Sequence, residues 1–249
     1  MQSRDRRIRL ISRPNTGIVG ALNDGLAISR GTFIARMDSD DISLPNRFAQ
    51  QETFLRLHPE HVLVGSRVLI VDPDGDILRE MGDAFSHEEI ETGLLARQGQ
   101  LVYHPSVMFR ADAVQSVGGY RSEFPHVEDL DLFLRLSEIG KLANIREPLL
   151  MYREHFSKVG FVFKKQQEVA ITAALEQAYQ RRHLTATPPD PARSDDHFLS
   201  ISDTCRKWAW WALAAGKTKT ARKHALAAIW RTPFSPATWR LFACTIRGY

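Results

Sequence analysis

In the first part of the chain, the spacing of the hydrophobic residues changes from that of a strand to that of a helix and back to that of a strand. Residues 7–12 alternate around Ile8 and Leu10, which predicts a strand that ends at the following turn formers. Residues 18–29 carry apolar side chains at helical spacing, and residues 32–37 are a short apolar run that predicts a second strand. A strand, a helix and a strand in this order form the βαβ unit of an α/β fold, so we expect a mostly parallel sheet.

The same reasoning predicts further elements and a division of the chain. Helices are expected over residues 45–57, 128–139 and 164–182, and another helix is expected to begin at the capping box of Ser86 and Glu89. Strands are expected over residues 62–71, 101–110 and 149–152, and a further strand is expected to begin at residue 77. Three prolines in residues 185–193 indicate a linker. We therefore expect one domain over residues 1–184, a linker over 185–195 and a helical tail over 196–249.

Composition narrows the classes of protein that fit. With 249 residues, 43% of them apolar, the chain is long enough for a sizeable core, and its net charge of +4 favours an anionic, phosphate-bearing ligand or a membrane surface rather than indicating nucleic acid. Its two cysteines lack metal spacing, and no apolar stretch approaches the length of a spanning helix. We expect a cytoplasmic protein with peripheral membrane contact through two amphipathic stretches of the tail.

A crowded acidic turn is the first candidate for chemistry. The stretch RMDSDDISLPN puts Asp38, Asp40 and Asp41 directly after the second predicted strand. Carboxylates at such a strand end project into the crevice where α/β sheets bind ligands, and hard oxygen ligands suit Mg²⁺ or Mn²⁺. A solvated turn without a cation explains the same spacing.

Three further stretches offer polar groups that chemistry could use. In HVEDLDLFLR, Asp129 lies at a helix start, where an ionised carboxylate is favoured and can accept a proton, although Glu128 and Asp129 also serve simply as helix-start acids. In MYREHFS, His155 could ligate a metal or be ordinary polar surface. In YHPSVMFR, His104 suits a structural hydrogen bond at least as well as a ligand contact.

Taken together and in this order, these segments resemble the inverting family 2 glycosyltransferases of the GT-A fold, bacterial enzymes that build surface polysaccharides and glycoconjugates. The matching stretches are RPNTGIVGALNDGLAISRGTFIARMDSDDISLPNRF, HPSVMFR, VGGYR, EDLDLFLRL and EPLLMYREH, which span residues 6–155. The resemblance implies a Rossmann-like, mostly parallel sheet. It also implies transfer of a sugar from a nucleotide-sugar donor, a UDP-sugar in first expectation, to a saccharide or lipid-linked saccharide acceptor.

The resemblance also implies roles for individual residues. Asp38 and Asp40 fall on the family's DxD motif, which holds Mn²⁺ or Mg²⁺ and the sugar nucleotide, with Asp41 adjoining. Two glycines, Gly118 and Gly119, fall on the loop beside donor and acceptor. At the helix start, Asp129 falls on the catalytic base and Glu128 precedes it on the donor side, while His155 falls on the histidine that completes metal coordination.

One departure from the family pattern opens alternatives. Family members usually begin with a strand, a helix and a second strand that bind the base and ribose, whereas this sequence starts at what resembles the third strand. We therefore expect a GT-A domain truncated at its N-terminus. A non-catalytic glycosyltransferase-like subunit or a degenerate homologue is the alternative, and a metal-dependent phosphotransferase or nucleotidyltransferase would share the acidic turn but explain the helix start and histidine less well.

Overall fold

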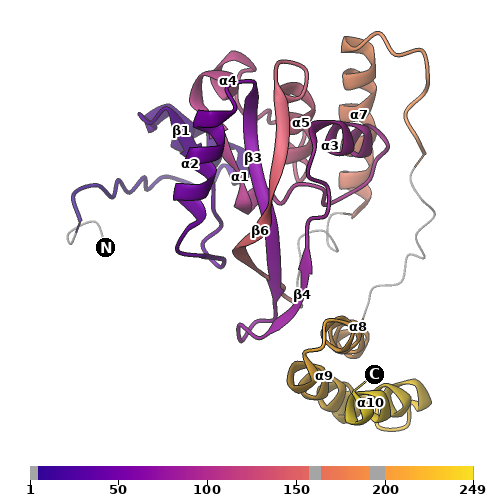
Figure 1. Cartoon of the computed structure of the whole chain (residues 1–249). Coiled ribbons are helices and arrows are strands. Elements are labelled where there is room, and N and C mark those ends of the chain that lie inside the picture. Colours follow the sequence, from indigo (N-terminus) through magenta and orange to yellow (C-terminus); the bar gives the residue numbers. More distant parts are fainter. Residues whose placement is uncertain (1–4, 157–163, 191–199, 249) are drawn as a thin grey trace.

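A computed structural model describes residues 5–156, 164–190 and 200–248 and gives an α/β fold (Figure 1). The strands are β1 (Phe33–Ala35), β2 (Ile42–Ser43), β3 (His61–Val71), β4 (Ile77–Met81), β5 (Met108–Arg110) and β6 (Lys141–Arg153). The helices are α1 (Gly17–Ile28), α2 (Arg47–Leu57), α3 (His87–Leu95), α4 (Ala111–Ser116), α5 (Glu128–Leu136), α7 (Lys164–Arg181), α8 (Ile201–Ala214), α9 (Thr218–Arg231) and α10 (Pro236–Arg247), with a 3₁₀ turn at His104–Ser106. The elements predicted from the sequence as α1, α2, α3, α5, α7, β1, β3, β4 and β6 are confirmed, with shifted ends.

The six strands form one mixed sheet in the order β1-β5-β3-β6-β2, with β4 paired to β3 outside this path. Only β3 and β6 run parallel, from His61 opposite Lys141 to Val71 opposite Arg153; the other described pairs are antiparallel. The expectation of a mostly parallel sheet is therefore wrong. The physical reason is that β1 pairs with β5 rather than with a strand on the other side of α1, so no βαβ unit forms in the described residues.

Two predicted strands differ in the structure. Residues 7–12 form no ladder, and Ile8 and Leu10 are 41% and 72% exposed. Alternation marks a face that could be buried, but a strand also needs a neighbour to accept and donate its hydrogen bonds. Residues 101–110 are a strand only over β5, because the 3₁₀ turn around Pro105, which lacks an N–H donor, interrupts the extended backbone.

Helices cover both faces of the sheet, as the alternation of strand side chains requires. On one face, Leu63, Phe109 and Leu142 pack with buried residues of α3, α4, α5 and α7 in the largest apolar cluster. The next residues in the same strands, among them Val64 and Met108, face the opposite side and pack against α2. The layers visible in Figure 1 thus follow from the period-2 pattern of the central strands.

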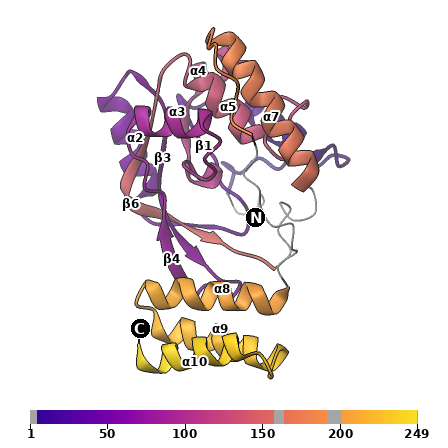
Figure 2. The same ribbon diagram turned by 90° about the vertical axis from the view of Figure 1, so that its right-hand side faces the viewer.

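The C-terminal helices form a separate layer beside the far end of β4 (Figure 2). Helix α8 buries Trp208 and Ala212 against Val68, Ile70 and Leu78 of the β3–β4 hairpin. The described part of the tail, residues 200–248, is helical as expected, with three helices rather than a hairpin of two. The boundaries of domain, linker and tail stay predictions, and residues 191–195 of the linker lie outside the described residues. Over the described ranges, no helix combines the length and apolar character needed to cross a bilayer.

Candidate functional site

The acidic turn follows β1 and is held by two buried arginines. Arg36 directs its guanidinium at both carboxylate oxygens of Asp38, with N···O distances of 2.6 and 2.8 Å. Arg47 on α2 is fully buried and donates to the carbonyl oxygens of Arg36 at 2.5 Å and Val107 at 3.3 Å. Burial lowers the pKa of Arg47 to about 10. These contacts fix where the turn leaves the sheet.

The end of β6 lies against the same turn because β2 pairs with it, Ile42 opposite Met151. The backbone N–H of Arg153 donates to Asp41 Oδ1 at 2.8 Å, and its side-chain Nε donates to the carbonyl of Asp40 at 2.8 Å. Two residues further on, His155 Nε2 lies 2.9 Å from Asp40 Oδ2. The structure therefore brings His155, 115 residues away in the chain, to the acidic turn.

The carboxylates are close enough to compete for protons or to share a cation. Ligand oxygens of Asp38, Asp40 and Asp41 all lie within 4.8 Å of one another. Burial, together with the charges of Asp40 and Asp38, raises the pKa of Asp41 to about 6, and its Oδ2 is buried without a hydrogen-bond partner. An unpartnered buried carboxylate oxygen beside two other carboxylates and an imidazole is a donor set that fits a divalent cation.

The start of α5 faces the acidic turn across a cleft of about 450 Å³. Asp38, Glu128 and Asp129 line this cleft together with Arg36 and Tyr103. Burial and the neighbouring charge of Asp129 raise the pKa of Glu128 to about 7. The pKa of Asp129 is also raised by removal from water, while its Oδ1 accepts the backbone N–H of Leu130 at 2.8 Å. The cleft thus holds two carboxylates, Glu128 and Asp129, that accept a proton more readily than exposed carboxylates do.

The glycine loop lies beside the cleft but not in its wall. Gly118 and Gly119 have φ values of 81° and 68°, which glycine adopts readily. A Cβ on Gly119 would meet Asn23 Oδ1 at 2.9 Å, and Asn23 exchanges two hydrogen bonds with the backbone of Tyr120. Neither glycine is among the described residues that line the cleft. The loop reaches the cleft through the Tyr120 hydroxyl, which lies 2.7 Å from Nε2 of the cleft residue His104.

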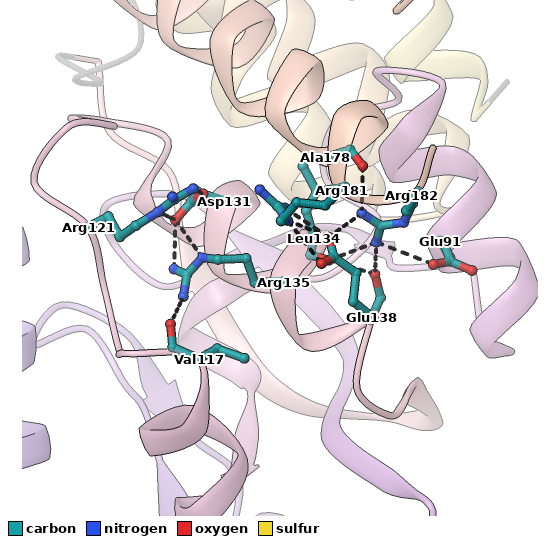
Figure 3. Close-up of polar contacts among 11 residues, drawn as sticks. Glu91, Val117, Arg121, Asp131, Leu134, Arg135, Glu138, Ala178, Arg181 and Arg182 are labelled. Atoms are coloured by element: carbon teal, nitrogen blue, oxygen red, sulfur yellow. Dashed lines mark hydrogen bonds and ion pairs between the residues drawn. The ribbon is translucent and has the colours of Figure 1, made fainter. Parts of the chain in front are cut away.

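An ion-pair network between α5 and the segment before it holds this loop in position (Figure 3). The buried carboxylate of Asp131 pairs with Arg121 and with Arg135. Arg135 then donates to the carbonyl oxygens of Val117 at 2.6 Å and Gly119 at 2.8 Å. The apolar spacing of α5 predicts its buried face, whereas this network is formed by charged residues that the sequence pattern alone assigns to the surface.

Sequence reasoning missed several groups of the site. Arg36, Tyr103 and Tyr152 line the cleft, and Arg36 pairs with Asp38, the first acid of the turn. A weak signal was present, since an arginine that directly follows the apolar residues of β1 is placed at a sheet end. His104 does make the hydrogen bond expected as one of its two alternatives, and it also lies in the cleft wall.

Fold and site together define an α/β domain with a carboxylate-lined cleft, beside which the acidic turn supplies oxygen ligands that fit a divalent cation. Residues 1–118 match the family model for Glycosyl transferase family 2. The chain therefore contains a domain of this family, as the resemblance predicted.

Named relatives agree with this assignment. The chain is 36% identical over 152 residues to the putative glycosyltransferase EpsE of Bacillus subtilis (strain 168), covering 59% of this chain and 53% of that protein. It is 37% identical to the amylovoran biosynthesis glycosyltransferase AmsE of Erwinia amylovora, with coverages of 56% and 51%. It is 32% identical to the O-antigen biosynthesis glycosyltransferase WbnJ of Escherichia coli, with coverages of 61% and 59%. The chain spans about half the length of the curated relatives it matches.

Among solved structures, the chain is similar to the mannosyltransferase PcManGT from Pyrobaculum calidifontis in complex with GDP-Man and Mn²⁺. The TM-score is 0.41 at 16% identity, covering 94% of this chain and 66% of that chain.

Proposed function

We propose that the protein is a metal-dependent inverting glycosyltransferase. It moves a sugar from a nucleotide-sugar donor, first of all a UDP-sugar, to a hydroxyl group of a saccharide or lipid-linked saccharide acceptor in surface polysaccharide or glycoconjugate biosynthesis. The observation that carries this proposal is that Asp129 and Asp38 line one cleft while His155 contacts Asp40. The cleft volume of about 450 Å³ suits part of a nucleotide sugar. We also propose that the glycosyltransferase domain extends beyond the matched residues to cover 1–184, and that the protein is cytoplasmic.

Asp38, Asp40 and His155 would hold Mn²⁺ or Mg²⁺, with Asp41 adjoining and supplying its unpartnered oxygen. When bound, such a cation neutralises the charge that grows on a leaving diphosphate. We assign Asp41, Glu128 and the loop of Gly118 and Gly119 to the donor side of the cleft.

Asp129 acts as the base in a single displacement. Its carboxylate accepts the proton of the acceptor hydroxyl while that oxygen forms a bond to the anomeric carbon and the bond from that carbon to the diphosphate oxygen breaks. Attack opposite to the leaving group inverts the anomeric carbon, and no covalent enzyme intermediate is needed. The raised pKa of Asp129 makes it a stronger base than an exposed aspartate.

The test is transfer or hydrolysis of UDP-sugars with and without Mn²⁺, compared between wild type, Asp129→Asn and Asp112→Asn. Asp112 is a matched control, because its Oδ1 accepts the N–H of the next residue at 2.8 Å, as that of Asp129 does, but it is not among the described residues that line the cleft. We expect Asp129→Asn to lower the rate by about 10²-fold or more and Asp112→Asn to leave it unchanged. Equal rates in all three would overturn the assignment of the base.

One observation favours the alternative of a non-catalytic subunit. Arg36 engages both oxygens of Asp38, so a cation must share that carboxylate with a buried guanidinium. Calorimetric titration with UDP and Mn²⁺ separates the two functions. If the protein is the proposed enzyme, we expect heat of binding only when UDP and Mn²⁺ are both present. This heat should be lost in Asp40→Asn and kept in Asp74→Asn, which changes an exposed acid of the β3–β4 turn. Absence of metal-dependent heat in the wild type would favour the non-catalytic subunit.

A further inference from the structure

One end of the C-terminal helices gathers large apolar side chains on the surface. Because α9 runs antiparallel to both α8 and α10, the start of α8, the end of α9 and the start of α10 meet at this end (Figure 2). Two contacts confirm the juxtaposition: Ser202 Oγ lies 2.8 Å from Thr232 Oγ1, and Arg206 donates to Ser235 Oγ at 3.4 Å.

Four residues at this end form what we call the aromatic tip: Ile201, Trp230, Phe234 and Trp239. Phe234 is 95% exposed, Trp230 87%, and the other two 50% each. The Trp239 indole N–H is satisfied by the carbonyl of Pro233 at 2.6 Å, so its ring is held outward by the turn between α9 and α10. Such a concentration of tryptophan and phenylalanine is costly in water and marks a binding surface.

The charge of the same helices identifies the chemistry of the partner. Residues 201–248 contain nine lysines and arginines and one acid, Asp203, whereas residues 1–200 contain 24 basic and 28 acidic residues. Lys223 pairs with acids of the β3–β4 turn and Arg206 with Asp203. Arg231 and Arg240, beside the aromatic tip, are exposed. The helices as a whole are therefore strongly positive, and Arg231 and Arg240 place part of this charge beside the aromatic tip.

We propose that the aromatic tip inserts into the headgroup region of a lipid bilayer that carries anionic lipids, with Arg231 and Arg240 against the charged headgroups. Tryptophan and phenylalanine suit the interface between headgroups and acyl chains, and clustered lysine and arginine attract anionic headgroups. A second copy of the chain would bring the same positive surface against itself, so like charges oppose self-association through this face.

The experiment is co-sedimentation of the full chain with phosphatidylcholine vesicles, either pure or mixed with phosphatidylglycerol. We expect binding to the mixed vesicles that falls as salt rises, and weak binding to the pure ones. The double variant Trp230→Ser, Phe234→Ser should lose binding by roughly tenfold or more, because two apolar side chains no longer insert. Both residues are exposed, so circular dichroism should show an unchanged fold.

Leu57→Ser is the matched control, since Leu57 is 70% exposed at the end of α2 and carries no basic cluster. It should bind vesicles like the wild type, as should Asp129→Asn, which separates this inference from the catalytic proposal. Binding that ignores anionic lipid, or that persists in the double variant, would overturn the inference. So would a wild-type dimer that the double variant converts to monomer, because the tip would then contact protein.

Discussion

At the scale of one residue, Glu128 shows how burial in the cleft favours the protonated form of a carboxyl group. Its side chain is buried, its Oε2 has no hydrogen-bond partner, and burial with the nearby charge of Asp129 raises its pKa from 4.5 to about 7. A carboxyl group with a raised pKa favours the protonated form in the folded chain. Folding stability therefore falls as pH rises from about 4.5 to about 7, where only the folded state still holds the proton.

Replacing Glu128 by glutamine should remove this cost. We expect Glu128→Gln to raise the free energy of unfolding by about 1–3 kcal/mol at pH 8, with little gain at pH 4. Denaturant unfolding at both pH values measures the difference. Glu123→Gln, an exposed acid of the preceding loop, is the control and should change little at either pH. An equal effect of Glu128→Gln at pH 4 and pH 8 would show that charge burial is not its cause.

At this scale, the acidic turn could be predicted from sequence because its three carboxylates are neighbours in the chain. His155 was a candidate metal ligand from its own stretch, but only the family resemblance linked it to the acidic turn. The bidentate pair of Arg36 with Asp38 was not predictable, because it depends on how deeply the Arg36 side chain is buried beneath the turn. The spacing of residues in the sequence identifies candidate groups, whereas the contacts that those groups make depend on how the chain packs.

At the scale of elements, periodicity predicted most helices and the long strands but not how the strands pair. The alternation of residues 7–12 is as regular as that of a strand, yet those residues have no ladder in the described structure. The direction of β1 beside β5 is set by contacts more than 70 residues apart, which no local window contains. The hairpin of β3 and β4 was predictable because its turn chemistry lies between its strands.

The β3–β4 turn also attaches the C-terminal helices, through one buried carboxylate. Asp72 is fully buried, accepts from Lys223 Nζ at 2.7 Å and contacts His224 Nε2 at 2.8 Å. Its other oxygen accepts the backbone N–H groups of Asp74 and Asp76 at 3.0 and 2.9 Å. The carboxylate therefore stabilises the turn and the attachment of α9 together.

We expect Asp72→Asn to lower the free energy of unfolding by about 2–4 kcal/mol, because an amide group would then face the ammonium of Lys223 in a buried position. Asp74→Asn is a close control, since Asp74 pairs with the same lysine at 2.7 Å but is 74% exposed. It should cost less than about 1 kcal/mol. Thermal unfolding followed by circular dichroism measures both, and equal losses would contradict a special role for Asp72.

At the scale of the whole molecule, the C-terminal helices form part of the support behind the cleft. The ring of Trp208 on α8 lies 4.6 Å from that of Phe156, the residue after His155. Trp208 also belongs to the apolar cluster that includes Tyr103, whose ring lies 5.4 Å from that of Tyr152. Since both tyrosines line the cleft, α8 stabilises one wall of it as well as the segment that carries His155.

This packing predicts that a change on α8 alters metal binding at the acidic turn. Trp208→Ala should lower the free energy of unfolding by about 3–5 kcal/mol, and it should weaken Mn²⁺ binding because Phe156 loses its packing partner beside His155. The milder Trp208→Phe should keep most of both properties. Trp210→Ala, on the same helix at 48% exposure, should change neither. Mn²⁺ titration well below the unfolding temperature of each variant measures the affinity, and an unchanged affinity in a folded Trp208→Ala protein would show that α8 supports the fold without positioning His155.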